Sequence, residues 1–505
     1  MTSPSHGLTR YETLVRACTQ GHALKIPFPQ IFGRVGPHNP VTGVAPDGKP
    51  FRADNVIKAF TKAIDAMEDK TDPDGPAEAA QTFFGQFIDH DVTLDATSAI
   101  GTRIDPRTIR NVRTPGLDLD CVYGDGPDGS PHIYLDKAGG YLLFGTRDNP
   151  LDLARTSKGR ALIGDPRNDD NLIVSQVQGL FICLHNILMY ALQKDVSMVA
   201  AAFQGVRAQA IDEGVSPSMK PFEAARRILR LHYHWLILNE FLPSFVDAKV
   251  LKGVLETIRK GKLPEPWVAH SPVMPVEFSG AAYRFGHATV QSRYRLNAAK
   301  QDVGLFDLGG FKPRGPEVNI EFKNLLAYPG QSGFQKARPI GRKLASAIFE
   351  LPERVVSDPL NIDGQVLDVV QARKLPLRNI FRDRFALELA SGQQMARAMG
   401  VPELAAPPEL KKSGITKAPL WYYCLHEAEK HGGKLGPVGG GIVATVLLRL
   451  MALDHESLLC SAADFKPWTA LGATSSGQWS LGRMAQFVEQ NRDKISVADK
   501  LRCPD

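Results

Sequence analysis

Cysteine is scarce in this chain of 505 residues, and its six cysteines are widely spaced. No two of them form a CxxC pair or a zinc-ligand spacing, which argues against a disulfide framework and against a zinc site. The first 17 residues contain no apolar run of the kind found in a signal peptide. We therefore expect a protein that is cytoplasmic or that is exported without a Sec signal peptide.

Long hydrophobic runs and basic clusters are also missing. The most apolar late stretch, residues 442–453, is interrupted by Arg449 and is too short to cross a bilayer, so we expect no transmembrane segment. Lysine and arginine are scattered, the net charge is +6, and no basic run alternates with aromatic residues. This pattern gives no indication of a nucleic-acid partner.

Strand patterns are short and weak throughout, whereas helical hydrophobic periodicity recurs along the chain. It predicts helices within residues 55–95, 170–200, 221–242, 340–351, 377–399, 417–430, 438–456 and 481–492. Proline and glycine are frequent between residues 20 and 55, so residues 1–55 are expected to form an extended arm. Residues 56–505 are expected to form one mainly α-helical unit. This unit is larger than a usual domain, which suits a cofactor buried at its centre.

The most informative stretch reads Gly-Gln-Phe-Ile-Asp-His-Asp and contains Gln86, Asp89, His90 and Asp91. It lies in a helix predicted over residues 76–94, where residues three and four apart are neighbours. Gln86, Asp89 and His90 therefore share one face, and Asp91 is turned by about 100° from His90. A polar face among phenylalanines is costly to bury unless it meets a polar partner. This stretch is the first candidate for a functional site.

Most of the thirteen histidines have no neighbouring group of polar residues, but His287 differs. Gly286 precedes it, and Arg284 lies three residues before it on the same helical face. A glycine beside an imidazole permits the close approach of a flat group. A single Gly-His pair is weak evidence for a ligand by itself.

Residues 164–171 read Gly-Asp-Pro-Arg-Asn-Asp-Asp-Asn. Asp-Pro followed by acidic residues is an ordinary helix start, because carboxylates favour the positive end of the helix dipole. The functional alternative is that Arg167 and Asp170, three residues apart, point together into a cavity.

Residues 114–120 read Thr-Pro-Gly-Leu-Asp-Leu-Asp, and their alternation places Asp118 and Asp120 side by side on an extended loop. Carboxylates, backbone carbonyls and a hydroxyl suit a hard cation such as calcium. The loop lacks the glycine and glutamate spacing of an EF-hand, and acidic loops are often only solvated. Both interpretations stay open at this point.

Three arginines, Arg378, Arg382 and Arg384, lie close together among apolar residues. They form either a solvated helix face or a set of partners for ligand carboxylates, for which guanidinium is well suited.

In this order and spacing, the five segments resemble the animal-type haem peroxidases of the peroxidase–cyclooxygenase superfamily. The resemblance covers about residues 75–460 and is nearest to bacterial members, which share patterns similar to residues 420–423 and 435–440. The glycines of the latter segment are expected to pack a helix closely. The resemblance implies a large, mainly α-helical domain with haem b buried between central helices.

On this resemblance, His90 is the distal histidine, Gln86 the distal glutamine and Arg167 the distal arginine. The histidine would move a proton between the two oxygens of hydrogen peroxide. The arginine would stabilise the charge on the departing oxygen. The implied activity is that of a haem peroxidase, and the implied partners are hydrogen peroxide and a small donor such as a phenol, an amine or a halide.

The resemblance also assigns residues to the haem itself. His287 corresponds to the proximal ligand of the iron, and Asn379 to the residue that accepts a hydrogen bond from its imidazole. Arg284 and Arg382 correspond to arginines near the haem propionates.

Members of the family often esterify two haem methyl groups to carboxylates, at positions that match Asp89 and Asp170. Asp170 is one methylene shorter than the glutamate usual there, so the match at the second ester is imperfect. Asn171 replaces a methionine that bonds a haem vinyl group in one member, so we expect no third link.

The resemblance implies a calcium site as well. Its ligands would be Asp91, Thr114, the carbonyl of Gly116, Asp118 and Asp120. Because Asp91 directly follows the distal histidine, the ion would fix the distal helix.

Two alternatives remain. A fatty-acid dioxygenase of the same superfamily would have a tyrosine three residues before the proximal histidine, but Arg284 stands there and Tyr283 is one residue further back. A haem-bearing adhesion or structural protein is the other alternative. The chain contains no RGD or KGD tripeptide and retains all the distal residues.

Overall fold

The fold is described from a computed structural model, which covers residues 32–39, 53–93, 116–135, 140–262, 274–362, 365–412, 414–462 and 464–492. The expected mainly α-helical class is confirmed. The longer helices are α2 (Ala53–Asp65), α3 (Ala79–Val92), α6 (Leu172–Lys194), α7 (Val196–Ala202), α8 (Val206–Gly214), α9 (Lys220–Leu236), α11 (Ala248–Arg259), α15 (Leu375–Phe381), α16 (Gly392–Ala398), α18 (Leu420–Ala428), α19 (Pro437–Leu453) and α21 (Leu481–Gln490). The shorter ones are α4 (Asp120–Tyr123), α5 (Gly126–Gly129), α10 (Leu242–Phe245), α12 (Val276–Gly280), α13 (Gly286–Thr289), α14 (Val369–Ala372), α17 (Pro408–Lys412) and α20 (Leu458–Ser461).

The strands form four separate two-stranded pairs within the described residues. Two pairs are parallel, β1 (Phe32–Gly33) with β3 (Met274–Pro275) and β2 (Glu68–Asp69) with β6 (Leu344–Ala345). Two are antiparallel, β4 (Arg293–Tyr294) with β5 (Val303–Gly304) and β7 (Leu360–Ile362) with β8 (Gln365–Leu367). They connect loops and do not form a layer of the core.

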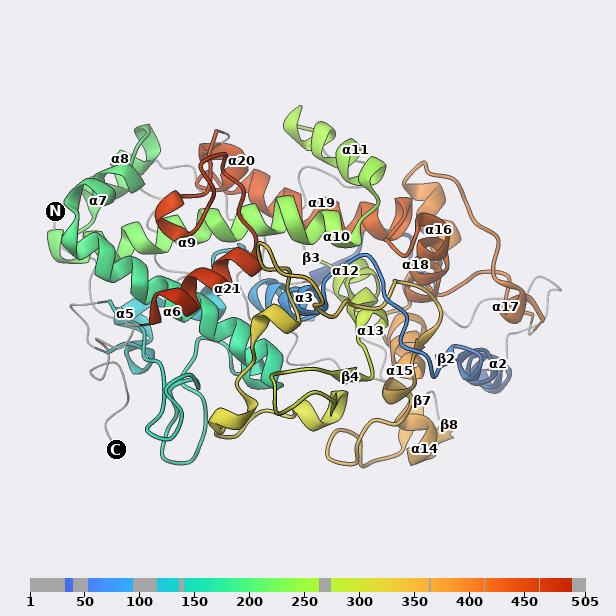
Figure 1. Ribbon diagram of the computed structural model, residues 1–505. Coiled ribbons are helices and arrows are strands. Elements are labelled where there is room, and N and C mark those ends of the chain that lie inside the picture. The colour runs from blue at the N-terminus through green and yellow to red at the C-terminus, as the bar shows by residue number, and fades with distance from the viewer. Residues whose placement is uncertain are drawn as a thin grey trace.

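Helix α3 lies at the centre of the molecule, with α6 and α9 on one side and α13, α15 and α18 on the other (Figure 1). Aromatic rings join α3 to its neighbours. Phe87 of α3 stacks on Phe181 of α6 with 4.6 Å between ring centroids, and both meet Tyr233 of α9 edge-on. Such pairs contribute about 0.5–1.5 kcal/mol each beyond the area they bury. The helix that carries the Gln-Phe-Ile-Asp-His-Asp stretch is therefore held firmly in the core.

Helix α6 starts where Asn171 accepts hydrogen bonds from the N–H groups of Ile173 and Val174, an N-cap. Among the described residues it alone has the length and apolarity of a membrane-spanning helix, and that apolar stretch is entirely buried inside the protein. A helix that is apolar all round is the expected pattern for a central core helix.

Two helices change to π-helical geometry beside the centre. Helix α9 continues as the π-helical turn η5 (Ile237–Phe241) into α10, and α15 continues as the π-helical turn η11 (Arg382–Ala386). Such turns are rare and occur frequently at functional sites.

One predicted helix is wrong, and another is interrupted. Residues 340–351 contain β6 and a single 3₁₀ turn, because the Leu344 N–H donates to the Met67 carbonyl and the segment pairs with β2. Residues 377–399 are broken after η11, where Glu388 adopts a φ of 46° and Ser391 starts a new helix with a capping box. Tertiary contacts overrode helix propensity in both cases.

The close packing expected for the glycines of residues 435–440 is confirmed. A Cβ atom on Gly440 would lie 2.8 Å from the Leu435 carbonyl oxygen and 2.9 Å from a methyl group of Val246. Both distances are too short for real contacts, so this start of α19 requires glycine.

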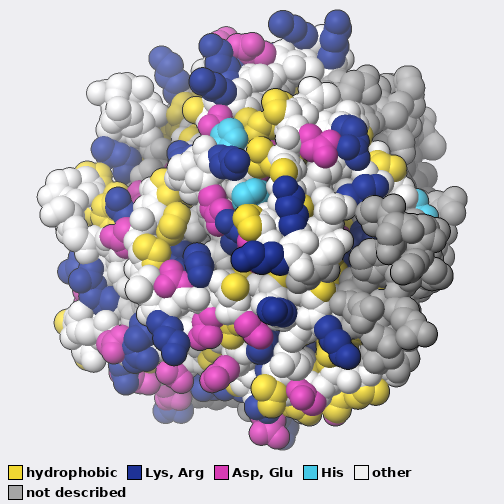
Figure 2. Space-filling view, turned by 90° about the vertical axis from the view of Figure 1, so that its right-hand side faces the viewer, with side chains coloured by type: hydrophobic (Ala, Val, Ile, Leu, Met, Phe, Trp, Pro, Cys, Tyr) yellow, Lys and Arg dark blue, Asp and Glu magenta, His cyan; other side chains and the backbone are white. Residues whose placement is uncertain are grey.

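The predicted arm is described only at residues 32–39. There β1 pairs with β3, and Arg34 donates to the carbonyls of Leu387 and Glu388 at 2.5 and 2.9 Å. The rest of the arm lies outside the described residues, and the division at residue 55 stays a prediction. On the face shown in Figure 2, basic and acidic side chains are interspersed over the described surface.

Candidate functional site

A cavity of about 530 Å³ lies beside α3 and is lined from several elements. The face predicted from the sequence is present, because Gln86, Asp89 and His90 all line this cavity, and His287 lines it as well. Seven aromatic residues contribute to the remaining wall, Phe83, Phe241, Phe245, Tyr283, Phe285, Phe306 and Phe311. The cavity thus joins two imidazoles that are far apart in the sequence within an apolar wall.

His90 is 7% exposed, and its Nδ1 lies 2.7 Å from Oδ1 of Asn168. Burial lowers the pKa of His90, and the neighbouring Arg167 guanidinium lowers it further. The imidazole is therefore neutral near pH 7, which is the state required of a proton acceptor.

Arg167 lies next to His90 but is not among the residues that line the cavity. Its guanidinium pairs with the buried Asp165 at 2.8 Å, and Nη2 donates to the His90 carbonyl at 2.9 Å. The expectation that Arg167 and Asp170 point together into the cavity is met by Asp170 only. Asp165 also caps the 3₁₀ turn η3 (Pro166–Asp169) by accepting from the Arg167 N–H. The same carboxylate therefore binds both the main chain and the guanidinium of Arg167, which keeps the guanidinium next to η3.

The carboxamide of Gln86 is held at both ends within the cavity. Its Nε2 donates to Asp170 at 3.2 Å, and its Oε1 accepts from Nδ2 of Asn171 at 3.0 Å. Asp89 lines the cavity nearby, and its Oδ1 accepts from the Thr93 hydroxyl at 2.9 Å. Two carboxylates, Asp89 and Asp170, are thus presented to the cavity from two different elements.

His287 lies in α13, and its Nδ1 is 2.9 Å from the amide nitrogen of Asn379. The two ends of a carboxamide have the same shape, so the same contact serves an imidazole that donates from Nδ1 to Oδ1. Burial first, and then Arg284 and Arg382, lower the pKa of His287 to about 3. The residue is half-buried and lines the cavity.

Gly286 supplies the space beside this imidazole. A Cβ atom placed on it would meet nothing within 4 Å, and the residue lines the cavity. A flat group can therefore lie against the backbone here, and the structure provides the predicted room for one.

The arginines of residues 378–384 are not a solvated face. Arg378 and Arg384 donate to the carbonyls of Ala372 and Leu389, whereas Arg382 is near enough to His287 to lower its pKa. Arg284 lines the cavity. Between the arginines, the buried Asp383 accepts from the Trp421 N–H at the start of α18.

Asp91 near the end of α3 forms a compact group of carboxylates with Asp118 and Asp120. One oxygen from each lies within 4.8 Å of the others, an arrangement that like charges oppose unless a cation joins them. Leu117 and Leu119 adopt left-handed conformations with φ of 47° and 62°. Thr114 lies outside the described residues, and Gly116 directly precedes this turn.

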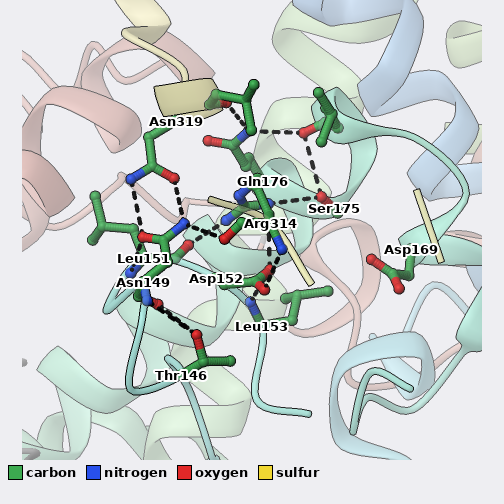
Figure 3. Close-up of polar contacts among 12 residues, drawn as sticks. Thr146, Asn149, Leu151, Asp152, Leu153, Asp169, Ser175, Gln176, Arg314 and Asn319 are labelled. Carbon is green, nitrogen blue, oxygen red and sulfur yellow. Dashed lines mark hydrogen bonds and ion pairs between the residues drawn. The ribbon is translucent and has the colours of Figure 1, made fainter. Parts of the chain in front are cut away.

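Turn η3 is held in place by a buried network of charged residues. Arg155 bridges Asp169 at 2.7 Å and Asp152 at 2.7 Å, and Asp152 also accepts from the Arg314 N–H. Figure 3 shows Asp152 and Arg314 packed beside Ser175 and Gln176 of α6. Two arginines and two aspartates balance in charge, which a buried ionic network requires. The network fixes the segment from which Arg167, Asn168 and Asp170 project.

Sequence reasoning assigned no role to several residues at this site. Asn168 lies within the segment 164–171, but the sequence pointed to no function for it. Gln178 lies in the apolar helix α6, and the only sequence signal for it is a polar side chain among apolar neighbours. Phe311 and Arg354 also line the cavity. Phe311 is 61% exposed with a φ of 56°, and only the fold brings it there.

The sequence of this chain is similar to those of known proteins. The sequence model of the animal haem peroxidase family matches residues 95–361, slightly more than half of the chain. The chorion peroxidase of Drosophila melanogaster is 31% identical over 368 residues, covering 67% of this chain and 41% of the relative. Heme peroxidase 2 of Caenorhabditis elegans is 27% identical over 206 residues, covering 38% of this chain and 26% of the relative. The chain spans less than half the length of these curated relatives.

Solved structures show the same fold at low identity. Peroxidase A from Dictyostelium discoideum superimposes with a TM-score of 0.55 at 12% identity, covering 95% of both chains. A fatty acid α-dioxygenase from Oryza sativa superimposes with a TM-score of 0.55 at 15% identity, covering 98% of this chain and 92% of that one. The fold alone therefore does not separate peroxidases from dioxygenases, whereas the family match extends over half the sequence. The chain belongs to the animal haem peroxidase family, and haem is the cofactor that this family implies.

Proposed function

We propose that this protein is a haem peroxidase that uses hydrogen peroxide to oxidise a small donor such as a phenol, an amine or a halide. The observation that carries the proposal is the cavity that His90 and His287 line together, with seven aromatic residues in its wall. The peroxidase names of the curated relatives support it.

The residues present fit a haem. His287, oriented by Asn379, would hold the iron, and Gly286 leaves room for a flat ring beside it. Arg284 and Arg382 would pair with the two propionates. Bound haem would supply an iron centre that accepts the oxidising equivalents of peroxide.

Proton movement would be the work of His90. Its neutral imidazole takes the proton from one peroxide oxygen and delivers it to the departing oxygen, which leaves as water. Gln86, fixed between Asp170 and Asn171, orients the peroxide or a water beside it. Arg167 adds positive potential near His90, although Asp165 partly neutralises it.

We further propose covalent attachment of the haem through Asp89, with Asp170 as the second candidate, since both carboxylates line the cavity. We also propose that Asp91, Asp118 and Asp120 bind calcium with the Gly116 carbonyl and Thr114. The convergence of three carboxylates supports this ion.

The decisive experiment removes the proton acceptor. His90→Ala is expected to retain haem, seen as a Soret band, but to react with hydrogen peroxide at least about 100-fold more slowly in stopped-flow absorbance, as expected for loss of a general base. His132→Ala, which removes an exposed histidine outside the cavity, is the control and is expected to react normally. An unchanged peroxide reaction in His90→Ala would falsify the assignment.

A fatty-acid dioxygenase is the second candidate, favoured by the position of Tyr283. This tyrosine is 7% exposed and lines the cavity. Its hydroxyl donates to the Gly85 carbonyl at 3.1 Å. A backbone carbonyl accepts this hydrogen bond but does not take up the proton as a basic side chain would. Incubation with linoleic acid and oxygen separates the two functions. Hydroperoxide products that disappear in Tyr283→Phe would identify the dioxygenase.

A further inference from the structure

A chain of hydrogen bonds connects His90 to the main chain of α4 through two buried carboxamides. His90 Nδ1 lies 2.7 Å from Oδ1 of Asn168, and Nδ2 of Asn168 donates to Oε1 of Gln178 at 2.8 Å. Nε2 of Gln178 then donates to the Cys121 carbonyl at 3.1 Å. Asn168, Gln178 and Cys121 are all 0% exposed, so water does not compete for these contacts.

The Cys121 carbonyl, at the end of this series of hydrogen bonds, fixes the donor and the acceptor in each of them. A backbone carbonyl can only accept, so the end of Gln178 that faces Cys121 must be its NH₂ group. The other end of Gln178 is then its oxygen, which requires the NH₂ group of Asn168 to face it. The oxygen of Asn168 therefore faces His90, and Nδ1 of the imidazole must donate.

We propose that Asn168 and Gln178 are positioning residues that fix His90 in the tautomer with its proton on Nδ1. In this tautomer Nε2 keeps a lone pair and is the ring nitrogen available to a ligand in the cavity. A neutral imidazole with the opposite tautomer would donate at that position and could not accept the peroxide proton. The inference about the tautomer stands on the hydrogen bonds, and only its use in catalysis rests on the proposed function.

A structural role alone would also explain buried carboxamides, since buried polar groups are normally hydrogen-bonded. Helix α6 offers a matched comparison. Gln176, two residues before Gln178, is 8% exposed and bonds to the Leu172 and Val318 carbonyls and to the Ile320 N–H. It has the same side chain and lies in the same helix, but its hydrogen bonds run to Leu172, Val318 and Ile320 and not to Asn168.

The test reads the tautomer directly, in the full-length haem-bound protein reduced and exposed to carbon monoxide. A hydrogen bond donated to the bound ligand lowers its C–O stretching frequency, whereas a lone pair at Nε2 gives no such lowering. The wild-type protein and Gln176→Met are expected to show the unlowered band in infrared spectra. Gln178→Met and Asn168→Leu are expected to add a lowered band, which disappears when His90→Ala is combined with them.

Asn168→Asp combined with Gln178→Met provides a rescue, because the carboxylate still accepts from Nδ1 and no longer faces the Gln178 oxygen, so this variant should keep the wild-type band. Peroxide reactions in Gln178→Met and Asn168→Leu are expected to slow by at least about tenfold, a part of the general-base contribution. Wild-type bands in both variants, or a lowered His90-dependent band already in the wild type, would overturn the proposal. If the bands shift as expected but the wild type does not react with peroxide, the tautomer assignment stands and the proposed function fails.

Discussion

The carboxylate of Asp89 is presented to the cavity while its Oδ1 accepts a hydrogen bond from Thr93. Asp170 reaches the cavity as well, but it accepts from Gln86. We expect the wild-type protein, once loaded with haem and treated with peroxide, to retain part of its haem through acid–acetone extraction. Asp89→Ala should retain less haem than the wild type, and any haem that it still retains would be attached through Asp170. Complete release from the wild type would show that neither ester forms.

A second single-residue effect concerns Glu240 of η5, which accepts from Gln81 and from the Leu481 N–H. Burial, assisted by the nearby Glu78, raises the pKa of Glu240 from 4.5 to about 8. An acid whose pKa is raised on folding holds its proton in the folded state while the unfolded chain has lost it. Its contribution to stability is therefore complete below pH 4.5 and is lost as the pH rises to about 8.

Glu240→Gln keeps the shape and removes this titration. We expect the stability of the variant relative to wild type to increase by up to about 4 kcal/mol between pH 5 and pH 8.5, since the pKa shift spans most of this range and one unit corresponds to about 1.4 kcal/mol. Thermal unfolding midpoints at the two pH values measure it. A constant difference between the two proteins would show that Glu240 titrates normally.

At the scale of elements, the start of α19 offers a sharp test of packing. Gly440→Ala would place a Cβ atom 2.8 Å from the Leu435 carbonyl oxygen, which belongs to the main chain and cannot rotate away. We expect a loss of about 1–3 kcal/mol, as for other overpacked sites. Gly253→Ala is the control, because Gly253 lies in the exposed part of α11 with open space around it. That change should stabilise the protein by up to about 1 kcal/mol through helix propensity.

The same scale shows what sequence could and could not predict. Helices such as α6, α19 and α21 could be predicted from their own residues, because α6 and α19 contain long apolar stretches and α21 has an apolar face that repeats with the helical turn. The breaks at Glu388 and at residues 344–349 could not be predicted, since a φ of 46° and pairing with β2 are set by distant segments. At the site, the spacing of Gln86, Asp89 and His90 placed them on one face of α3, and they line one cavity. The direction of the Arg167 side chain could not be predicted, because it also depends on the carbonyl of His90, which lies 77 residues away along the chain.

At the scale of the whole molecule, the group of Asp91, Asp118 and Asp120 connects the central helix to a loop, and His234 of α9 donates to the Leu117 carbonyl at 2.8 Å in that loop. We expect calcium at 100 times its dissociation constant to stabilise the protein by about 2.7 kcal/mol. EGTA should lower the thermal midpoint correspondingly. Asp118→Asn combined with Asp120→Asn should abolish the calcium response, while Asp128→Asn, an exposed acid on α5, should not. A calcium response that persists in the double variant would place the ion elsewhere.

The position of Asp91 directly after His90 limits how this site can be transplanted. Neither residue can be moved without the other, and Asp91 Oδ2 also accepts from the Leu119 N–H at 3.3 Å. His90 in turn depends on Asn168, whose partner Gln178 ends on the carbonyl of Cys121, one residue after Asp120. The segments 86–91, 116–121 and 165–170 and helix α6 are thus joined to one another by hydrogen bonds. A designer who grafts the site onto another scaffold must carry all four pieces in one fixed geometry, because each determines the orientation of the next.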